Sequence, residues 1–331
     1  MDWGSILENA VRAAFGPQAA VYALAAIGLN VHYGYTGLLN FGHAGFMLLG
    51  AFGLAVTVNT LGWSMWVGIG MGLLWPLALA LAMGLPTLRL RADYFAITTI
   101  AAAEIIRIWF RSSSAQDWSG GVFGLSGGFG RDFYALNPFE PGRYGFGALS
   151  YPSNQLWALL VTWALVVLVT VFVAALIRSP WGRVIRAVRE DEEAVRSLGK
   201  NAFAYKMQSL LLGGAIGGLA GIMFALAGQT AHPNAFQPQV TFFLYAIIIL
   251  GGAATRLGPI VGAMIFWFIL SGLESMLRQA RATAFIPDFL AGGARVGAVA
   301  TAAVGIGIIL LLVFRPQGIF GKRREIALDV K

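Results

Sequence analysis

The sequence predicts an all-α, polytopic helical membrane protein with about eight or nine transmembrane helices, organised as a single domain over residues 1–331. Of its 331 residues, 58% are hydrophobic and only 11% are charged, whereas a soluble domain carries about 25% charged residues. The mean hydropathy is +0.72. The apolar runs are long and continuous, unlike the alternating pattern of a membrane β-barrel.

Four apolar runs in the first part of the chain are predicted as spans: Ala19–Val31, Gly34–Val56, Leu61–Leu85 and Tyr94–Phe110. The first is short and crosses a membrane only if its helix continues to Tyr33. The second contains six glycines together with Asn40 and His43. Such a segment either packs tightly against its neighbours or is broken at membrane depth, and the sequence leaves both possibilities open.

A long connection and five further apolar runs follow: Leu156–Ile177, Phe203–Ala227, Val240–Leu250, Ile260–Leu277 and Val296–Phe314. The connection, residues 112–154, is rich in Gly, Ser, Pro and aromatic residues and sparse in basic ones. We therefore predict that it is an external loop.

Basic residues indicate the orientation of the chain. Of the 23 Lys and Arg, 15 fall at 89–91, 178–206, 256 and 315–331, which the alternation of spans places on one side. The positive-inside rule makes that side cytoplasmic, with 315–331 as a cytoplasmic tail and the N-terminus outside. The net charge of +8 is then explained by orientation and by membrane lipid, and we expect no nucleic-acid partner. The N-terminus shows no cleavable signal peptide.

Residues 179–201, SPWGRVIRAVREDEEAVRSLGKN, form the one long charged segment between two apolar runs. Charge of this density requires water, and its basic residues indicate the cytoplasm. The spacing of Val184, Val188, Val195 and Leu198 places them on one face of a helix, and Arg186 and Glu190 are spaced to pair. The segment is either a solvated helix that maintains topology or a docking element for a soluble cytoplasmic partner.

The sequence contains no recognisable catalytic or metal-binding pattern. It has no cysteine, and its three histidines, His32, His43 and His232, are far apart. It also lacks a phosphate-binding P-loop, a metalloprotease motif and a serine nucleophile elbow. We therefore predict no catalytic residue, no metal and no cofactor, and a membrane enzyme is disfavoured.

Polar residues within spans are the candidates for a translocation pathway: Asn40, Gly42, His43 and Glu104. Glu104 precedes Arg107 by one helical turn, which favours a structural ion pair over a titrating proton relay. Glu274 and Arg278 repeat the arrangement near the predicted outer face, where pairing is the ordinary explanation. For Asn40 and His43, bonding across helices competes with a role in lining the pathway.

Several ordered blocks resemble the inner-membrane permeases of branched-chain amino acid ABC importers, in particular the LivM type. They are GYTGLLNFGHAGFMLLGAF at 34–52, YFAITTIAAAEIIRI at 94–108, SGGVFGLSG at 119–127, the segment 179–201, HPNAFQP, GGAATRLGPIVGAM and FRPQGIFG. Together they cover most of the chain after Gly28. Asn40 stands where serine is common in the family and Asp191 where asparagine is common, and Ala253 and Arg256 also depart from its pattern.

The resemblance implies a type II ABC importer-like permease of a bacterial inner membrane, which moves leucine, isoleucine and valine. Its implied partners are a sister permease of LivH type, two cytoplasmic ATP-binding subunits that hydrolyse ATP, and a periplasmic binding protein. It implies that 179–201 is the coupling segment, with Gly182, Arg183, Arg186, Ala187, Arg189 and Glu190 as coupling residues. The alternatives are a urea or short-amide permease of the same family and, in a different class, a proton-coupled secondary transporter that uses Glu104.

Overall fold

The computed structural model describes residues 2–90, 92–145, 147–282, 295–314 and 319–320. The described helices of four or more residues are α1 (Trp3–Phe15), α2 (Pro17–Asn30), α3 (His43–Asn59), α4 (Met65–Thr87), α5 (Ala92–Arg111), α6 (Gln116–Ser119), α7 (Arg131–Ala135), α8 (Ser153–Arg178), α9 (Pro180–Glu190), α10 (Glu192–Ser197), α11 (Ala202–Gly228), α12 (Pro238–Gly251), α13 (Gly258–Ala282) and α15 (Arg295–Phe314), with a π-turn at Val31–Tyr35 and a 3₁₀ turn η5 at Pro233–Phe236. Two short antiparallel pairs join β1 (Leu125–Ser126) to β4 (Thr230–Ala231) and β2 (Arg143–Tyr144) to β3 (Tyr151–Pro152).

The prediction of a polytopic helical membrane protein is confirmed. Within the described residues, four helices are long and apolar enough to cross a membrane, namely α4, α8, α11 and most of α13. The bent pair α1–α2, which continues to Tyr35, makes a fifth, and its axis changes direction by 42°. The other predicted runs are covered by α5, by α15 and by two shorter apolar helices, α3 and α12.

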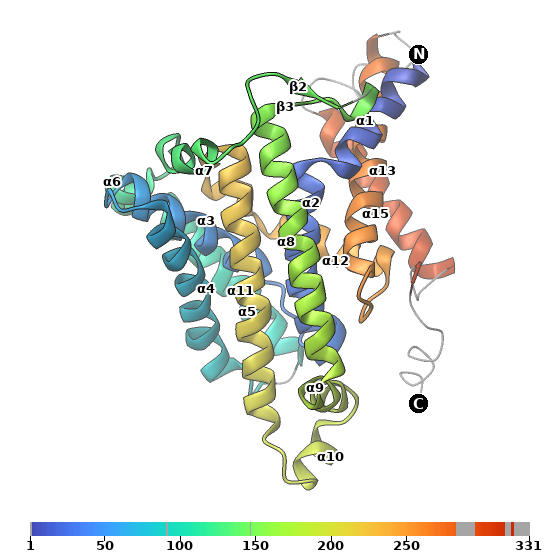
Figure 1. The fold of residues 1–331 in the computed structure, drawn as a ribbon. Helices are drawn as coiled ribbons and strands as arrows, with labels where there is room; N and C mark the ends of the chain where they lie inside the picture. Colours follow the sequence, from blue (N-terminus) through green and yellow to red (C-terminus); the bar gives the residue numbers. More distant parts are fainter. Residues whose placement is uncertain (1, 91, 146, 283–294, 315–318, 321–331) are drawn as a thin grey trace.

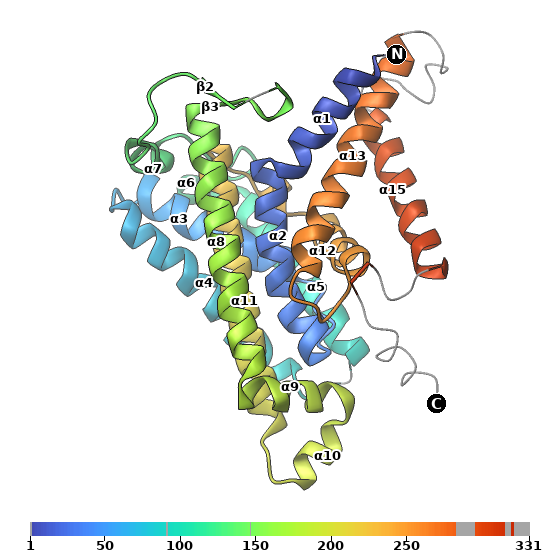
Figure 2. The same cartoon turned by 45° about the vertical axis from the view of Figure 1, so that its right-hand side comes forward.

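The two ends of the helical bundle are formed by different elements. The helices α9 and α10 lie together at one end of the bundle, whereas α1, α6, α7 and the β2–β3 pair lie at the other end (Figure 1). The long helices α8 and α11 connect the two ends (Figures 1 and 2). The charged segment and the long connection 112–154 are thus on opposite ends, as the predicted alternation of spans requires.

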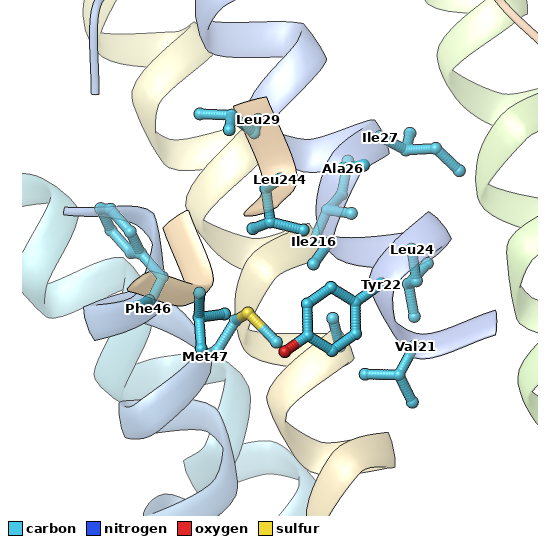
Figure 3. Close-up of a cluster of buried hydrophobic side chains, with 14 of the residues drawn as sticks. Val21, Tyr22, Leu24, Ala26, Ile27, Leu29, Phe46, Met47, Ile216 and Leu244 are labelled. Atoms are coloured by element: carbon cyan, nitrogen blue, oxygen red, sulfur yellow. The ribbon is translucent and has the colours of Figure 1, made fainter. Parts of the chain in front are cut away.

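The core forms around α2, in which every residue from Ala19 to Asn30 is buried. Its apolar side chains pack with Phe46 and Met47 of α3 and with Ile216 of α11 (Figure 3). Small residues allow α2 and α11 to approach closely, because a β-carbon at Gly28 would lie 2.7 Å from the carbonyl oxygen of Gly213. Backbone contact of this kind fixes the position of α2 at the centre of the bundle.

The charged segment differs from its predicted form in three respects. It comprises two helices, because the chain turns at Asp191 (φ −154°), whose carboxylate caps α10 at the backbone N–H of Ala194 over 2.9 Å. The turn changes the helical register, so Val188 and Val195 are buried while Leu198 is 80% exposed. Within the described residues, no ion pair joins Arg186 to Glu190, since Arg186 instead donates to backbone carbonyls.

The predicted cytoplasmic tail 315–331 lies outside the described residues except for Ile319 and Phe320. The backbone N–H of each donates to the end of α12, Ile319 to Leu250 over 3.0 Å and Phe320 to Gly251 over 3.1 Å. This places the two residues beside the same helix terminus.

Candidate functional site

The glycine-rich second run is broken and also packs tightly, so both possibilities that the sequence left open are realised. The helix α2 continues through its π-turn to Tyr35, and α3 begins only at His43. We call residues 36–42 between them the break. Its backbone caps the end of the preceding helix, since Leu38 N–H donates to the carbonyl of His32 over 2.8 Å and Gly37 N–H to that of Tyr33 over 3.1 Å. Gly37 takes a left-handed conformation, with φ +75°.

The start of α3 is held by hydroxyl groups from two other helices. Phe41 N–H donates to Oγ1 of Thr99 on α5 over 3.1 Å, and Ala44 N–H donates to Oγ1 of Thr241 on α12 over 2.9 Å. Backbone N–H groups at a helix start have no partner within the helix, and an apolar surrounding makes them costly to leave unpaired. The packing of α5 and α12 therefore determines where the break ends.

A fully buried polar cluster lies beside the break. Asn40 Oδ1 accepts from Gly42 N–H over 2.9 Å, so the amide nitrogen of Asn40 is directed to His32 Nδ1 at 3.1 Å. His32 Nε2 lies 3.1 Å from the carbonyl oxygen of Leu210 on α11. This arrangement of donors and acceptors corresponds to an imidazole that carries its proton on Nε2. Asn40 thus connects the break to α2 and, through His32, to α11.

His43 is enclosed rather than exposed to a pathway in this conformation. Its ring meets that of His32 edge to face at 5.4 Å between centroids, and a β-carbon at Gly217 would lie 2.9 Å from its Nε2. Its side chain is fully buried, and neither ring nitrogen has a hydrogen-bond partner of normal geometry in the described part of the chain. Of the four predicted pathway residues, Asn40, Gly42 and His43 therefore lie together at the break.

Glu104 lies apart from that cluster, on α5. It pairs with Arg107 at 2.5 Å, and Arg107 also donates to Oδ1 of Asn234 in η5 over 3.0 Å. The Arg107 side chain is 10% exposed and that of Glu104 is 31% exposed. This geometry is the structural ion pair that the spacing favoured, and it ties α5 to the segment that precedes α12. The second expected pair, Glu274 with Arg278, is looser at 3.8 Å.

Three of the predicted coupling residues attach α9 to the rest of the molecule. Arg186 donates to the carbonyls of Ile177 over 2.7 Å and Gly182 over 3.1 Å, which fixes the elbow between α8 and α9. Gly182 is required at this elbow, because a β-carbon there would lie 2.5 Å from the Cα of Ile177. Arg189 Nη1 donates to the carbonyl oxygen of Gly34 over 2.6 Å. The coupling segment therefore contacts the end of the helix that precedes the break.

Arg189 makes the contact between α9 and the break. The Arg189 side chain also packs on Gly37, where an added β-carbon would lie 3.1 Å from its Cγ. A cavity of about 290 Å³ lies between α9 and the break and is lined by residues of both. Glu192 of α10 pairs with Arg196 at 2.6 Å and with Lys206 of α11. The pair with Lys206 attaches α10, in the second half of the predicted coupling segment, to α11.

The remaining predicted coupling residues, Arg183, Ala187 and Glu190, are exposed at the end of the bundle. Within the described residues, the side chains of Arg183 and Glu190 take part in no hydrogen bond or ion pair. The six residues thus divide into an attached set and an outward-facing set, a division that their spacing alone did not reveal.

Sequence reasoning missed a connection of α2 to the α12–α13 turn, at Asn30. Its side chain donates to the carbonyl of Thr255 over 2.9 Å and accepts from Ala254 N–H over 2.9 Å, which locks the α12–α13 turn onto α2. The signal was present, since Asn30 is a lone amide in an apolar run. In the part of the chain that the structure describes, no three His, Asp or Glu side chains gather as a metal site.

Comparisons with known proteins agree on the family. Residues 15–314 match the family described as "Branched-chain amino acid transport system / permease component". The high-affinity branched-chain amino acid transport system permease protein LivM of Escherichia coli K12 is 29% identical over 313 residues, which cover 92% of this chain and 68% of the relative. The probable branched-chain amino acid transport permease protein LivM of Methanocaldococcus jannaschii is 26% identical over 349 residues, covering 94% and 93%.

More distant import permeases share only part of the chain. The autoinducer 2 import system permease protein LsrC of Photorhabdus laumondii is 29% identical over 147 residues, which cover 42% of this chain and 43% of the relative. No solved structure matches the chain. The family match extends over nearly the whole chain, which confirms the resemblance to LivM-type permeases. The chain therefore belongs to the family of permease components of branched-chain amino acid transport systems.

Proposed function

We propose that this chain is the transmembrane permease subunit of an ATP-driven importer in a bacterial inner membrane, and that it translocates leucine, isoleucine and valine. Its family and the names of its LivM relatives support this substrate class. A periplasmic binding protein delivers the amino acid, and a sister permease of LivH type completes the membrane unit. ATP hydrolysis takes place in two cytoplasmic partner subunits.

The proposed topology assigns one role to each end of the bundle. Residues 1–331 form one permease domain, with 112–154 on the periplasmic side and 179–201 and 315–331 in the cytoplasm. The ATP-binding subunits dock on the outward-facing residues Arg183, Ala187 and Glu190. Charged and small side chains that are free of internal partners suit a polar interface with a soluble protein.

The contact between Arg189 and Gly34 carries this proposal. It joins the docking helix directly to the helix end at the break, through a hydrogen bond to a charged donor. Because Arg186 and Gly182 hold α9 rigidly to α8, a displacement of α9 by the ATP-binding subunits also displaces the carbonyl of Gly34. The break then changes its conformation, which alters access to the pathway that Asn40, Gly42 and His43 border.

The two alternatives receive less support. A urea or short-amide permease of the same fold would use the same coupling geometry, but the named LivM relatives act on branched-chain amino acids. A proton-coupled transporter would need Glu104 as a titrating group, whereas its carboxylate is engaged by Arg107. A charge already paired by a guanidinium is poorly suited to take up and release protons.

The test uses Arg183→Glu in the chain co-expressed with its genetic neighbours. We expect the variant to insert and to keep its sister permease, but to lose the ATP-binding subunits on purification and to lose ATP-driven leucine uptake. The matched control is Arg131→Glu on α7, an exposed arginine at the opposite end of the bundle. Normal recovery of ATP-binding subunits with Arg183→Glu would contradict the docking role. Absence of leucine uptake by the unmodified complex would contradict the importer itself.

A further inference from the structure

A cavity of about 550 Å³ opens at the end of the bundle opposite to α9. Its walls come from α1, α2, α8, α11 and α13, which surround the point where α1 and α2 bend (Figure 2). None of the residues predicted from the sequence as coupling or pathway residues lines it. The cavity has room for an amino acid and lies at the end of the bundle that the proposed topology places on the periplasmic side.

One arginine supplies the charge of this cavity. The Arg12 guanidinium lies over the ring of Tyr151 at 5.3 Å from its centroid, and the Tyr151 hydroxyl donates to the Arg12 carbonyl over 3.0 Å. Burial raises the pKa of the Tyr151 hydroxyl, which is therefore a neutral donor and forms no ion pair with Arg12. These contacts hold Arg12 at the wall of the cavity.

Within the described residues, Arg12 forms no ion pair, and the other polar side chains of the wall are neutral. They include the amides of Gln18 and Gln155, which also make no hydrogen bond inside the described part of the chain. A single unpaired guanidinium among neutral amides attracts an anion and binds a carboxylate well, through charge-assisted hydrogen bonds.

The wall also contains groups that suit the rest of an amino acid. Val21 and Phe224 provide an apolar surface. The last turn of α11 lies in the wall at Ala227 and Gly228. Carbonyls at a helix C-terminus lack partners within the helix and carry partial negative charge, which favours an ammonium group.

We propose that this outer cavity is an acceptor site for an α-amino acid with an apolar side chain, in which Arg12 binds the carboxylate. The apolar side chain packs on Val21 and Phe224, and the ammonium group faces the end of α11. The site lies within this one subunit and receives the amino acid after its release from the binding protein. This inference rests on the proposed function and adds to it a binding site and a recognition chemistry.

The test is labelling with photo-leucine, which keeps the carboxylate and ammonium groups of leucine. The purified complex, without binding protein, is irradiated with photo-leucine, and labelled peptides are identified by mass spectrometry. We expect label in peptides that contain residues 12–21 and 224–228. Leucine should protect against labelling, and leucine amide, which lacks the carboxylate, should protect at least about tenfold less well.

Variants at Arg12 provide the second part of the test. Arg12→Gln should reduce labelling about tenfold or more, and Arg12→Lys should restore part of it, because the positive charge returns without the planar fork. Arg111→Gln, at an exposed arginine at the end of α5, is the matched control and should label normally. The comparison of leucine with leucine amide on the unmodified complex needs no variant and covers the case in which Arg12→Gln does not fold.

Label elsewhere in the chain, equal protection by leucine and leucine amide, or unchanged labelling of a folded Arg12→Gln complex would each overturn the acceptor site. The same preparations are assayed for ATP-driven leucine uptake with the binding protein present. Uptake by the unmodified complex without labelling of the cavity would remove this inference and leave the proposed function intact. Labelling of the cavity without leucine uptake would contradict the proposed importer function and would leave amino acid binding in the cavity intact.

Discussion

The break interrupts a predicted span, whereas α9 connects two spans, and the two regions place their polar groups in opposite environments. At the break, Asn40 is completely buried and hydrogen-bonded, and the backbone N–H groups of Phe41 and Ala44 find acceptors on α5 and α12. On α9, Arg183 and Glu190 are exposed and make no internal bond within the described residues. Polar groups that are satisfied inside a protein define a conformation, whereas those left free in water are available to a partner.

Arg189 belongs to both regions. Arg189 belongs to the exposed helix α9, and its guanidinium donates to the carbonyl of Gly34 at the buried end of the helix that precedes the break. A positive charge at a helix C-terminus also interacts favourably with the helix dipole. The two regions therefore differ in exposure and are connected through one arginine. The following changes test how far each region depends on packing, on internal hydrogen bonds and on this one connection.

The largest effect is expected from Gly221→Ala on α11. The new β-carbon would overlap the carbonyl of Met47 on α3 and lie 2.8 Å from its Cα, and backbone cannot move aside as a flexible side chain can. We expect a loss of about 3 kcal/mol or more in stability, at the upper end of overpacking. Thermal melting of the purified protein measures it. The control, Gly70→Ala on α4, has no atom within 4 Å of the new β-carbon and should be stable.

Asn40→Leu should have the next largest effect. It removes the acceptor for Gly42 N–H and the donor to His32, both in a fully buried environment. An unsatisfied buried group costs about 1–3 kcal/mol, so we expect a loss of this size or somewhat more in thermal stability. Asn40→Ser, which keeps a hydrogen-bonding group at this position, should retain more stability than Leu. Equal stability of all three proteins would show that the break does not depend on this amide.

The contrast between the two regions also explains what the sequence could predict. Helical spans, the separation of the charged segment from the connection 112–154 and the Glu104–Arg107 pair follow from composition and short spacing. The acceptor for Ala44 is Thr241, 197 residues away, and such a partner depends on how α3 and α12 pack. Leu198 was predicted wrongly to share one helix face with Val188 and Val195, because Asp191 caps a new helix and changes the register. Local patterns predict elements, whereas a broken span depends on distant hydroxyls and amides.

Arg189→Gln tests the connection itself. The glutamine side chain is shorter and uncharged, so we expect it to lose the bond to the Gly34 carbonyl while Arg183 and Glu190 remain free to dock. The ATP-binding subunits should still co-purify, but leucine transported per ATP hydrolysed should fall several-fold, since α9 no longer moves the break. Loss of the ATP-binding subunits instead would place Arg189 in the docking interface. An unchanged ratio would show that coupling follows another route.

Glu104→Gln should have a smaller effect, because the pair is partly exposed. We expect thermal stability to fall by at most about 1 kcal/mol and uptake to keep its pH profile. Arg107 would retain its hydrogen bond to Asn234, which limits the loss of stability. A pH optimum of uptake that shifts with this substitution would favour a proton relay and would revive the secondary-transporter alternative.

The smallest effect, and one of opposite sign, is expected from Ala254→Gly. Ala254 lies in the turn that Asn30 holds against α2, and its φ of +58° is a left-handed conformation that alanine adopts at a cost of roughly 1–2 kcal/mol. Glycine removes that cost but loses more backbone entropy on folding, so a net gain of about 0.5 kcal/mol is expected. Thermal melting of Ala254→Gly beside Ala253→Gly, the neighbouring position, measures it. If Ala254→Gly and Ala253→Gly raise the melting temperature equally, the gain in stability does not come from the left-handed conformation of Ala254. The turn that Asn30 contacts would then carry no backbone strain.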